Sequence, residues 1–143
     1  MTNTTLILDS SVIAKWFFPE VDNEKALILK DKFIDRSISI AIPLLLFYEI
    51  NNILKTATKS LRIDTREAIK VYKAFLNLDF IIYSSEFLMV STLEIAIRFN
   101  ISSYDASYVA LAEHLQAIFL TADKKLLNKV SSKFILDLKN YSV

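Results

Sequence analysis

The sequence contains no glycine and no cysteine among its 143 residues, and only one histidine, His114. Without glycine, the chain cannot carry a glycine-rich phosphate loop or a dinucleotide-binding fingerprint. Without cysteine, disulfides, thiolate nucleophiles and cysteine-based zinc sites are excluded. A single histidine also argues against a histidine-rich metal site or a Ser-His-Asp triad. Carboxylates therefore remain as the main candidates for catalysis.

Strong net charge, long hydrophobic runs and a basic leader are also missing. The 17 basic and 16 acidic residues give a formal net charge of +1, so any nucleic-acid contact depends on a local patch. The longest apolar stretch, residues 40–48, is much shorter than the roughly 20 residues that span a bilayer. No signal peptide is visible. We therefore expect a cytoplasmic protein without membrane contact, folded as a single domain over residues 1–143.

Short apolar runs alternate along the chain with longer amphipathic stretches. The short runs predict strands at 4–8, 38–42, 80–84, 117–121 and 133–138. The longer stretches predict helices at 10–17, 23–36, 44–59, 64–78, 86–99, 104–115 and 123–130. This alternation is typical of an α/β protein with helices on both faces of a mainly parallel sheet.

Local signals predict several helix starts. Ser10 or Ser11 offers an N-cap to the first helix. Pro43 fits the first turn of the helix that follows the second strand. Asp64, with Glu67 three residues later, has the pattern of a capping box.

Two aspartates lie at or just beyond the carboxyl ends of predicted strands, where a parallel sheet gathers functional groups, and a third lies in the first turn of a helix. Asp9 follows the first predicted strand, Asp123 follows the fourth, and Asp105 lies in the first turn of a helix. Each also suits a helix N-terminus, as a cap or as a partner of the helix dipole. Position alone therefore leaves capping and a functional site open.

Glu49 is harder to explain by packing, because it is the only charged residue between positions 44 and 54. An acid within so apolar a helix is costly unless it is paired, neutralised or coordinated. The alternative is that Glu49 reaches solvent from the edge of the core. Lys15 and Lys124 could pair with Asp9 and Asp123, but such pairs would explain only two of the acids.

Brought together, these carboxylates would repel by ~4 kcal/mol per close pair at an effective dielectric of ~20. A divalent cation removes that repulsion, and oxygen ligands favour Mg²⁺ or Mn²⁺ over Zn²⁺. Such a site supports hydrolysis of a phosphodiester. At this point the metal site is a hypothesis based on spacing.

Four segments, LDSSVIAKWF, PLLLFYEINNIL, YDASYVALAEHLQA and FLTADKKLL, occur in the order and approximate spacing of the PIN domain. The sequence most closely resembles the VapC-type toxins of toxin–antitoxin pairs, from about residue 5 to the end. The resemblance implies a three-layer α/β/α sandwich with about five strands and a metal-dependent ribonuclease that acts on RNA. It also implies a homodimer that binds a cognate antitoxin protein.

The resemblance also assigns roles to residues. The catalytic acids that would hold Mg²⁺ or Mn²⁺ match Asp9, Glu49, Asp105 and Asp123. Hydroxyl groups that orient the carboxylates match Ser11 and Thr121. The segment EHLQAIFLTAD lacks the glycine that many relatives have before the last strand of the motif, so this turn must be built differently.

Several other residues have both a structural and a functional interpretation. Trp16, Phe17 and Phe18 are predicted to pack in the core, with a groove for an antitoxin helix as the alternative. His114 is expected at the surface. Residues near the acids that remain candidates for substrate or site contacts are Lys15, Glu94, Arg98, Lys124 and Lys125.

The leading prediction is a metal-dependent endoribonuclease, and two other functions remain open. A catalytically inactive PIN-like interaction module would not need to retain all four acids. Aspartyl phosphoryl transfer, with Asp9 as nucleophile, usually needs a second acid two residues later, where Ser11 stands.

Overall fold

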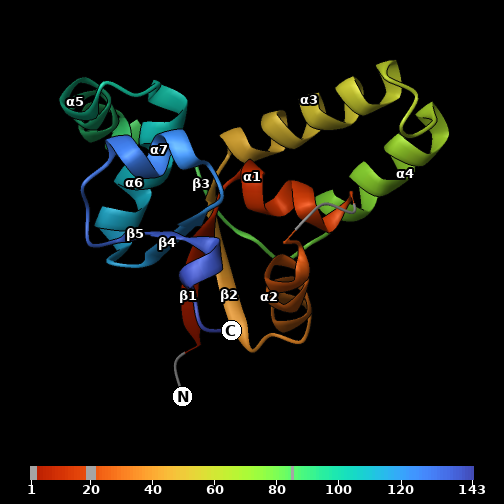
Figure 1. Ribbon diagram of the computed structural model, residues 1–143, viewed down its shortest axis with the longest axis horizontal. Helices are drawn as coiled ribbons and strands as arrows, with labels where there is room; N and C mark the ends of the chain where they lie inside the picture. The colour runs from red at the N-terminus through yellow and green to blue at the C-terminus, as the bar shows by residue number, and fades with distance from the viewer. Residues whose placement is uncertain (1–2, 19–21, 85) are drawn as a thin grey trace.

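A computed structural model describes residues 3–18, 22–84 and 86–143 (Figure 1). Five parallel strands form one sheet in the order β3-β2-β1-β4-β5. These strands are β1 (Thr4–Leu8), β2 (Ile38–Pro43), β3 (Ile81–Tyr83), β4 (Ile118–Thr121) and β5 (Ile135–Asp137). The predicted α/β fold around a parallel sheet is confirmed.

Helices cover both faces of this sheet. They are α1 (Ser10–Ile13), α2 (Glu24–Ile34), α3 (Leu45–Lys59), α4 (Thr65–Leu76), α5 (Met89–Phe99), α6 (Ser103–Leu115) and α7 (Lys124–Lys129). Short 3₁₀ turns are η1 (Ala14–Trp16), η2 (Glu86–Leu88) and η3 (Leu138–Asn140). Figure 1 shows α5 and α6 on one side of the sheet and α2 on the other, with α3 and α4 projecting as a hairpin. No helix in the described ranges is long and apolar enough to cross a membrane.

The central strands are buried on both faces, which explains why they read as continuous apolar runs. Residues 6–8 of β1 and 40–42 of β2 are almost completely shielded from solvent. The edge strand β3 differs, because Ile81 and Ile82 are 42% and 49% exposed. The centre of the sheet is therefore its most completely buried part, and it positions the residues at the carboxyl edge.

An aromatic cluster fills the space between the sheet, α2 and the α3–α4 hairpin. Phe75 is 1% exposed, and its ring lies 5.4 Å from that of Phe80 and 5.7 Å from that of Phe17. Trp16 stacks on Phe80 and donates its indole N–H to the carbonyl of Ala26 at 2.9 Å. The prediction of core packing for the Trp16–Phe17 region therefore agrees with the structure.

The prediction for Pro43 is wrong. Pro43 is the last residue of β2, where it pairs with Tyr83, and α3 begins two residues later. The backbone N–H of Leu44 donates to the carbonyl of Tyr83 at 3.2 Å. Proline is tolerated at this position because β2 is ending and the next residue supplies the hydrogen bond to β3.

Aspartate side chains cap both α1 and α4. Asp9 caps α1, since its side chain accepts hydrogen bonds from the backbone N–H groups of Ser11 and Val12. The prediction that Ser10 or Ser11 supplies this cap is wrong. Asp64 caps α4 as predicted, with its carboxylate 2.8 Å from the backbone nitrogen at position 67.

Four helices end in the same hydrogen-bonded motif without using glycine. The residues that follow α2, α3, α5 and α6 in left-handed backbone geometry are Arg36 (φ 67°), Leu61 (φ 62°), Asn100 (φ 51°) and Gln116 (φ 50°). At each end the next N–H donates five residues back, as Ala117 does to Ala112 at 3.0 Å. A residue with a Cβ pays about 1–2 kcal/mol for this geometry. The glycine-free turn before β4 is thus built by Gln116.

Leu61→Gly should therefore stabilise the protein by about 1 kcal/mol, because glycine adopts left-handed geometry without the Cβ clash. The side chain lost is 90% exposed, so little packing is removed. Urea unfolding should show a higher midpoint with an unchanged slope. Ser60→Gly, at φ −87°, is the control and should bring no gain. A Leu61→Gly midpoint at or below that of the wild type would contradict this explanation.

Candidate active site

The order of the strands reverses at β1. From β1 the chain proceeds to β2 and β3 on one side, and it later adds β4 and β5 on the other. Leu8 of β1 is in register with Leu120 of β4, so Asp9 and Thr121 follow at adjacent strand ends. Open parallel sheets bind ligands at such a reversal, outside the carboxyl ends of the strands. Sheet topology thus brings Asp9 and Asp123 to the same edge.

Asp9 is buried, at 6% exposure, and both of its carboxylate oxygens accept hydrogen bonds. Oδ1 accepts from the hydroxyl of Ser11 at 2.5 Å and from the backbone N–H of Val12 at 3.3 Å. Oδ2 accepts from the hydroxyl of Thr121 at 2.6 Å. The aspartate is therefore both the cap of α1 and a carboxylate held in one orientation by two hydroxyl groups.

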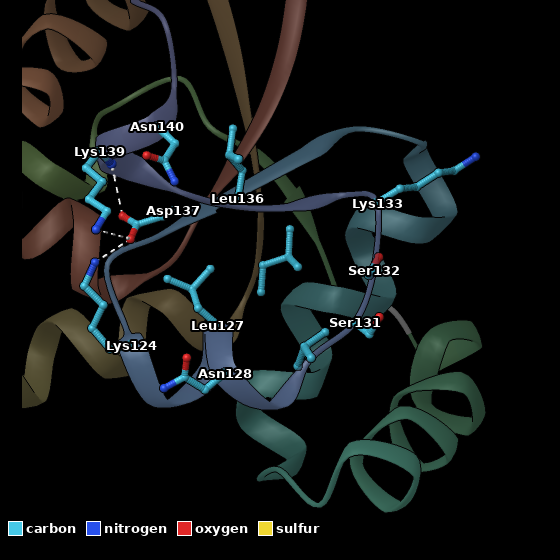
Figure 2. Close-up of a pocket in the computed structure, with 12 residues that line it drawn as sticks. Lys124, Leu127, Asn128, Ser131, Ser132, Lys133, Leu136, Asp137, Lys139 and Asn140 are labelled. Carbon is cyan, nitrogen blue, oxygen red and sulfur yellow. Dashed lines mark hydrogen bonds and ion pairs between the residues drawn. The ribbon is translucent and has the colours of Figure 1, made fainter.

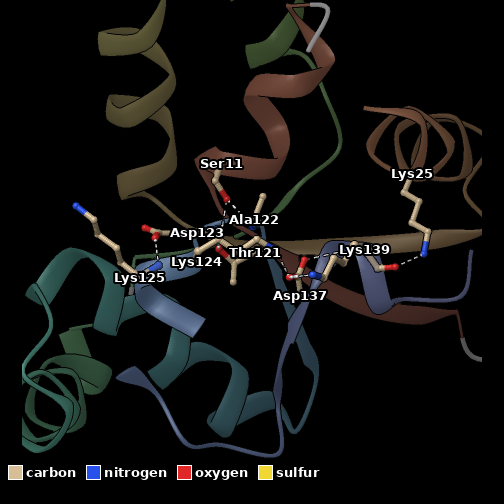
Figure 3. A network of polar contacts seen from close by, with 9 residues as sticks. All are labelled: Ser11, Lys25, Thr121, Ala122, Asp123, Lys124, Lys125, Asp137 and Lys139. Atoms are coloured by element: carbon tan, nitrogen blue, oxygen red, sulfur yellow. Dashed lines mark hydrogen bonds and ion pairs between the residues drawn. The ribbon is translucent and has the colours of Figure 1, made fainter. Parts of the chain in front are cut away.

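The same two hydroxyl groups link the end of β1 to the start of α7. The hydroxyl oxygens of Ser11 and Thr121 lie 3.3 Å apart. Ser11 also accepts from the backbone N–H of Ala122 at 2.9 Å, and Thr121 accepts from that of Asp123 at 3.1 Å. Figure 3 shows Ser11 approaching Ala122 beside Asp123. Asp123 in turn caps α7 with its carboxylate.

Glu49, which is partly buried on α3, makes two hydrogen bonds toward neighbouring helices. Its Oε1 accepts from the phenol of Tyr108 on α6 at 2.5 Å. Its Oε2 accepts from the hydroxyl of Ser10 on α1 at 3.4 Å. These contacts direct Glu49 toward the carboxyl edge of the sheet, so the alternative of a side chain that merely reaches solvent does not describe it.

Tyr108 was not among the predicted site residues. It is 1% exposed, and its ring stacks on Phe119 at 5.5 Å, so by packing alone it belongs to the core. Burial and the charge of Glu49 raise the pKa of Tyr108 well above its usual range, so the phenol remains a donor. The sequence signal that could have identified Tyr108 is its position one helical turn after Asp105, because residues three apart share a helix face.

Burial, and to a smaller extent neighbouring acids, raise the pKa values of Asp9, Glu49 and Asp105. Burial raises the pKa of Asp9 to about 6, and the charge of Glu49 adds to the shift. Burial raises the pKa of Glu49, with a further contribution from the charge of Asp105. Burial also raises the pKa of Asp105, with the charge of Asp123 adding to it. Charge interactions therefore link the four predicted acids in a series, from Asp9 through Glu49 and Asp105 to Asp123.

The arrangement is not a closed metal cage. Among residues 3–18, 22–84 and 86–143, no three acidic or histidine side chains are grouped closely enough to hold a metal ion as they stand. The ion pairs of Arg36, Lys124 and Lys139 involve acids outside the predicted set, Asp79 and Asp137. The donor set nevertheless fits a hard divalent cation, since it consists of carboxylate oxygens. Burial is the main cause that raises the pKa values of Asp9, Glu49 and Asp105.

Four of the remaining candidates have exposed side chains. His114 is exposed at the end of α6, as predicted, with its ring 5.0 Å from that of Phe87. Glu94 and Arg98 are exposed on α5. Among the lysines near Asp123, Lys124 forms an ion pair with an acid outside the predicted set, Asp137.

The raised pKa of Asp9 gives the metal-free protein a defined pH dependence. A carboxyl group that titrates near pH 6 when folded and near 3.8 when unfolded favours folding at low pH. That stability is present below about pH 4 and is lost as the pH rises through 6. Asp9→Asn should therefore become more stable than the wild type by about 3 kcal/mol between pH 4 and 7.

Urea unfolding in EDTA across this pH range measures the difference in the free energy of unfolding. Asparagine can still accept the cap hydrogen bonds through its side-chain carbonyl, so the cap itself is preserved. Asp64→Asn, at an exposed N-cap distant from the site, is the control. A difference between Asp9→Asn and the wild type that stays constant from pH 4 to 7 would refute the buried-charge interpretation.

Comparisons with known proteins add a family and several structural likenesses. A family model described as PIN domain matches residues 6–132. The structure is similar to that of PAE2754 from Pyrobaculum aerophilum, with 26% identity and a TM-score of 0.67, over 97% of this chain and 93% of that one. A comparison with curated proteins finds no match.

Two further likenesses concern the fold alone, since their sequence identities are low. VapBC-1 from nontypeable Haemophilus influenzae shows 14% identity and a TM-score of 0.65, over 96% of this chain and 100% of that one. VapC20 from Mycobacterium tuberculosis, described as a sarcin–ricin loop cleaving toxin, shows 14% identity and a TM-score of 0.58. That match covers 86% of this chain and 93% of the other.

Proposed function

The chain belongs to the PIN domain family, and on that basis we propose that it is a metal-dependent endoribonuclease, the VapC-type toxin of a toxin–antitoxin pair. The observation that carries the proposal is the convergence of Asp9, Glu49, Asp105 and Asp123 on one electrostatic neighbourhood at the sheet edge. The likeness to VapC20, described as a sarcin–ricin loop cleaving toxin, supports the substrate class. With such a substrate, the proposed location is the cytoplasm.

The four acids would hold Mg²⁺ or Mn²⁺, which when bound supplies Lewis-acid chemistry to phosphodiester hydrolysis. The chain's own contribution is orientation. Ser11 and Thr121 hold the carboxylate of Asp9 from two sides, and Tyr108 holds that of Glu49. These hydrogen bonds hold both carboxylates in defined orientations.

A catalytically inactive interaction module is less well supported. The raised pKa of Asp9 means that its charge opposes folding at neutral pH. A module that only binds a partner gains nothing from this cost, whereas a metal-binding site recovers it when the cation enters.

An exposed apolar face on α5 suggests how two copies assemble. Val90, Leu93 and Ile97 share one side of the helix and are 71%, 56% and 73% exposed. Phe87 and Tyr104, at 64% and 66% exposure, extend this face. Contiguous apolar patches of this kind mark interaction surfaces. We assign this face to a homodimer, and a second partner, an antitoxin protein, is supported by the likeness to a toxin–antitoxin complex from Klebsiella pneumoniae, with 14% identity and a TM-score of 0.67.

Asp105→Asn should reduce metal-dependent RNA cleavage by roughly 100-fold or more, as loss of one charge-stabilising group at an active site does. The assay uses purified protein and a pool of structured and single-stranded RNA, with EDTA, Mg²⁺ or Mn²⁺. Asp64→Asn, which removes an exposed acid elsewhere, should cleave like the wild type. Full cleavage by Asp105→Asn would refute the site assignment.

Metal binding can be followed without cleavage. Mn²⁺ should raise the melting temperature of the wild type, because the ion binds the folded state and relieves repulsion among the acids. The rise should be largely lost in the double variant Asp9→Asn/Asp105→Asn. An equal rise in the double variant would show that the ion binds elsewhere.

Ile97→Glu should convert the proposed dimer to a monomer, because it places a charge at the centre of the apolar face. Sedimentation velocity measures the change in mass. Ile69→Glu, at a position 53% exposed on α4, is the matched control and should remain dimeric. A wild type that sediments as a monomer at micromolar concentration would contradict the assignment of this face.

A further inference from the structure

The carboxyl end of β5 carries a second charged group one strand away from the acid cluster. Asp137, the last residue of β5, is in register with Thr121 of β4, whose hydroxyl binds Asp9. Neighbouring strands lie about 4.8 Å apart, so the two strand ends are close. Asp137 was not among the predicted site residues, and its surroundings differ from those of the acid cluster because they are rich in lysine.

Two lysines converge on Asp137, as Figure 2 shows. The ammonium group of Lys124 forms an ion pair with Oδ2 of Asp137, and that of Lys139 lies 3.9 Å from the same oxygen. The lysine side chains are 60% and 65% exposed, whereas that of Asp137 is 12% exposed. We call Lys124 and Lys139 the lysine pair. One carboxylate thus faces two ammonium groups, and the charge of Asp22 also acts on Lys124.

The backbone that carries the lysine pair is held in place. Asp137 accepts the backbone N–H of Lys139 at 3.1 Å, which caps η3. Lys25 of α2 donates to the carbonyls of Lys139 and Tyr141, at 2.6 and 2.7 Å. Burial acts to raise the pKa of Asp137, but hydrogen bonds from Lys124 and from the backbone of Lys139 outweigh it and lower the pKa. The carboxylate therefore stays ionised and orients both lysines.

The lysine pair separates two cavities. A cavity of about 660 Å³ lies between α7 and β5, and one of about 450 Å³ lies between the start of α7 and α2. Lys124, Asp137 and Lys139 line both cavities. The smaller cavity is also lined by Ala122, whose N–H donates to Ser11 of the acid cluster.

The larger cavity is suited to a nucleotide. The hydrogen-bonding side chains that line it, besides the lysine pair and Asp137, are Asn128, Ser131, Ser132, Lys133 and Asn140. Asp137 is the one acid in this lining, against three lysines. The volume falls within the range typical of small-molecule sites. Polar groups of these kinds hydrogen-bond to phosphate and sugar oxygens.

We propose that the lysine pair binds a backbone phosphate of single-stranded RNA beside the phosphodiester that the acid cluster cleaves, and that the strand continues into the cavity between α7 and β5. This proposal rests on the proposed ribonuclease function. A cluster of four acids repels RNA, and the whole chain has a net charge of only +1, so substrate must be held by a local cationic group. The lysine pair is such a group at the neighbouring strand end.

A purely structural role explains less of the arrangement. One lysine would neutralise Asp137, and the second adds a charge that no further acid of the larger cavity balances. Both ammonium groups are mostly exposed, so they keep donors available for a ligand.

The test measures the binding of a labelled, unstructured RNA of about 12 nucleotides to the full chain in EDTA. Fluorescence anisotropy gives the affinity at several salt concentrations. Lys124→Gln and Lys139→Gln should each weaken binding roughly threefold to tenfold at low salt. For a single strand, each lost phosphate contact should also lower the slope of log K against log salt by about 0.7. The double variant should lower it by about 1.4.

Lys129→Gln is the matched control, because Lys129 lies on the same helix and donates to the carbonyl of Asn100 instead of lining either cavity. It removes the same charge and should leave the affinity and the slope nearly unchanged. Equal losses in Lys129→Gln and the lysine-pair variants would overturn the proposal, because they would indicate general attraction. Failure of the wild type to bind RNA at low salt would overturn it as well.

Asp137→Asn separates orientation from charge. The substitution adds a unit of positive charge, so general attraction alone would tighten RNA binding. If Asp137 holds the lysine pair in register with the strand, binding should instead weaken. Tighter or unchanged binding would overturn the positioning role of Asp137.

Cleavage assays keep this proposal distinct from the proposed function. In Mn²⁺, the lysine-pair variants should raise KM more than they lower kcat, whereas Asp105→Asn should lower kcat. RNA binding that depends on the lysine pair, without metal-dependent cleavage by the wild type, would refute the nuclease and retain the RNA-binding surface. Metal-dependent cleavage with a KM that is unchanged in the double variant would refute the surface and retain the nuclease.

Discussion

Repulsion among carboxylates at one edge of the sheet is the constraint on which the rest of the site depends. Parallel strand order forces the ends of β1 and β4 together, and the residues there are acids. The fold tolerates them through hydrogen bonds, from Ser11 and Thr121 to Asp9 and from Tyr108 to Glu49. These bonds orient the carboxylates without neutralising their charge.

Much of this arrangement was predictable from the sequence, because the signals were local. Short apolar runs identified the strands, and the acids at their ends followed from the geometry of parallel sheets. Glu49 could be identified because a lone charge in an apolar helix conflicts with packing. A helix cap and a functional site were posed as alternatives for Asp9. The structure shows the cap, and it also shows that burial and the charge of Glu49 raise the pKa of the same carboxyl group.

Other features depend on contacts between distant segments and had no local signature. From the sequence alone, Tyr108 resembles any core aromatic residue. Only the fold shows that α3 places Glu49 within hydrogen-bond distance of its phenol. From the sequence alone, Asp137 is a residue near the end of a short strand. Only the pairing of β5 with β4 places it beside Thr121. The role of Pro43 was misjudged because a proline suits a strand end as well as a first helical turn, and only pairing with β3 distinguishes them.

The left-handed residues that end four helices acquire a different meaning when the unfolded chain is considered. Glycine broadens the conformations open to an unfolded backbone more than any other residue, and this chain has none. Each residue therefore loses less backbone freedom on folding than a glycine at the same position would. The absence of glycine therefore restricts the backbone conformations of the denatured ensemble. This restriction partly offsets the native-state strain at Arg36, Leu61, Asn100 and Gln116.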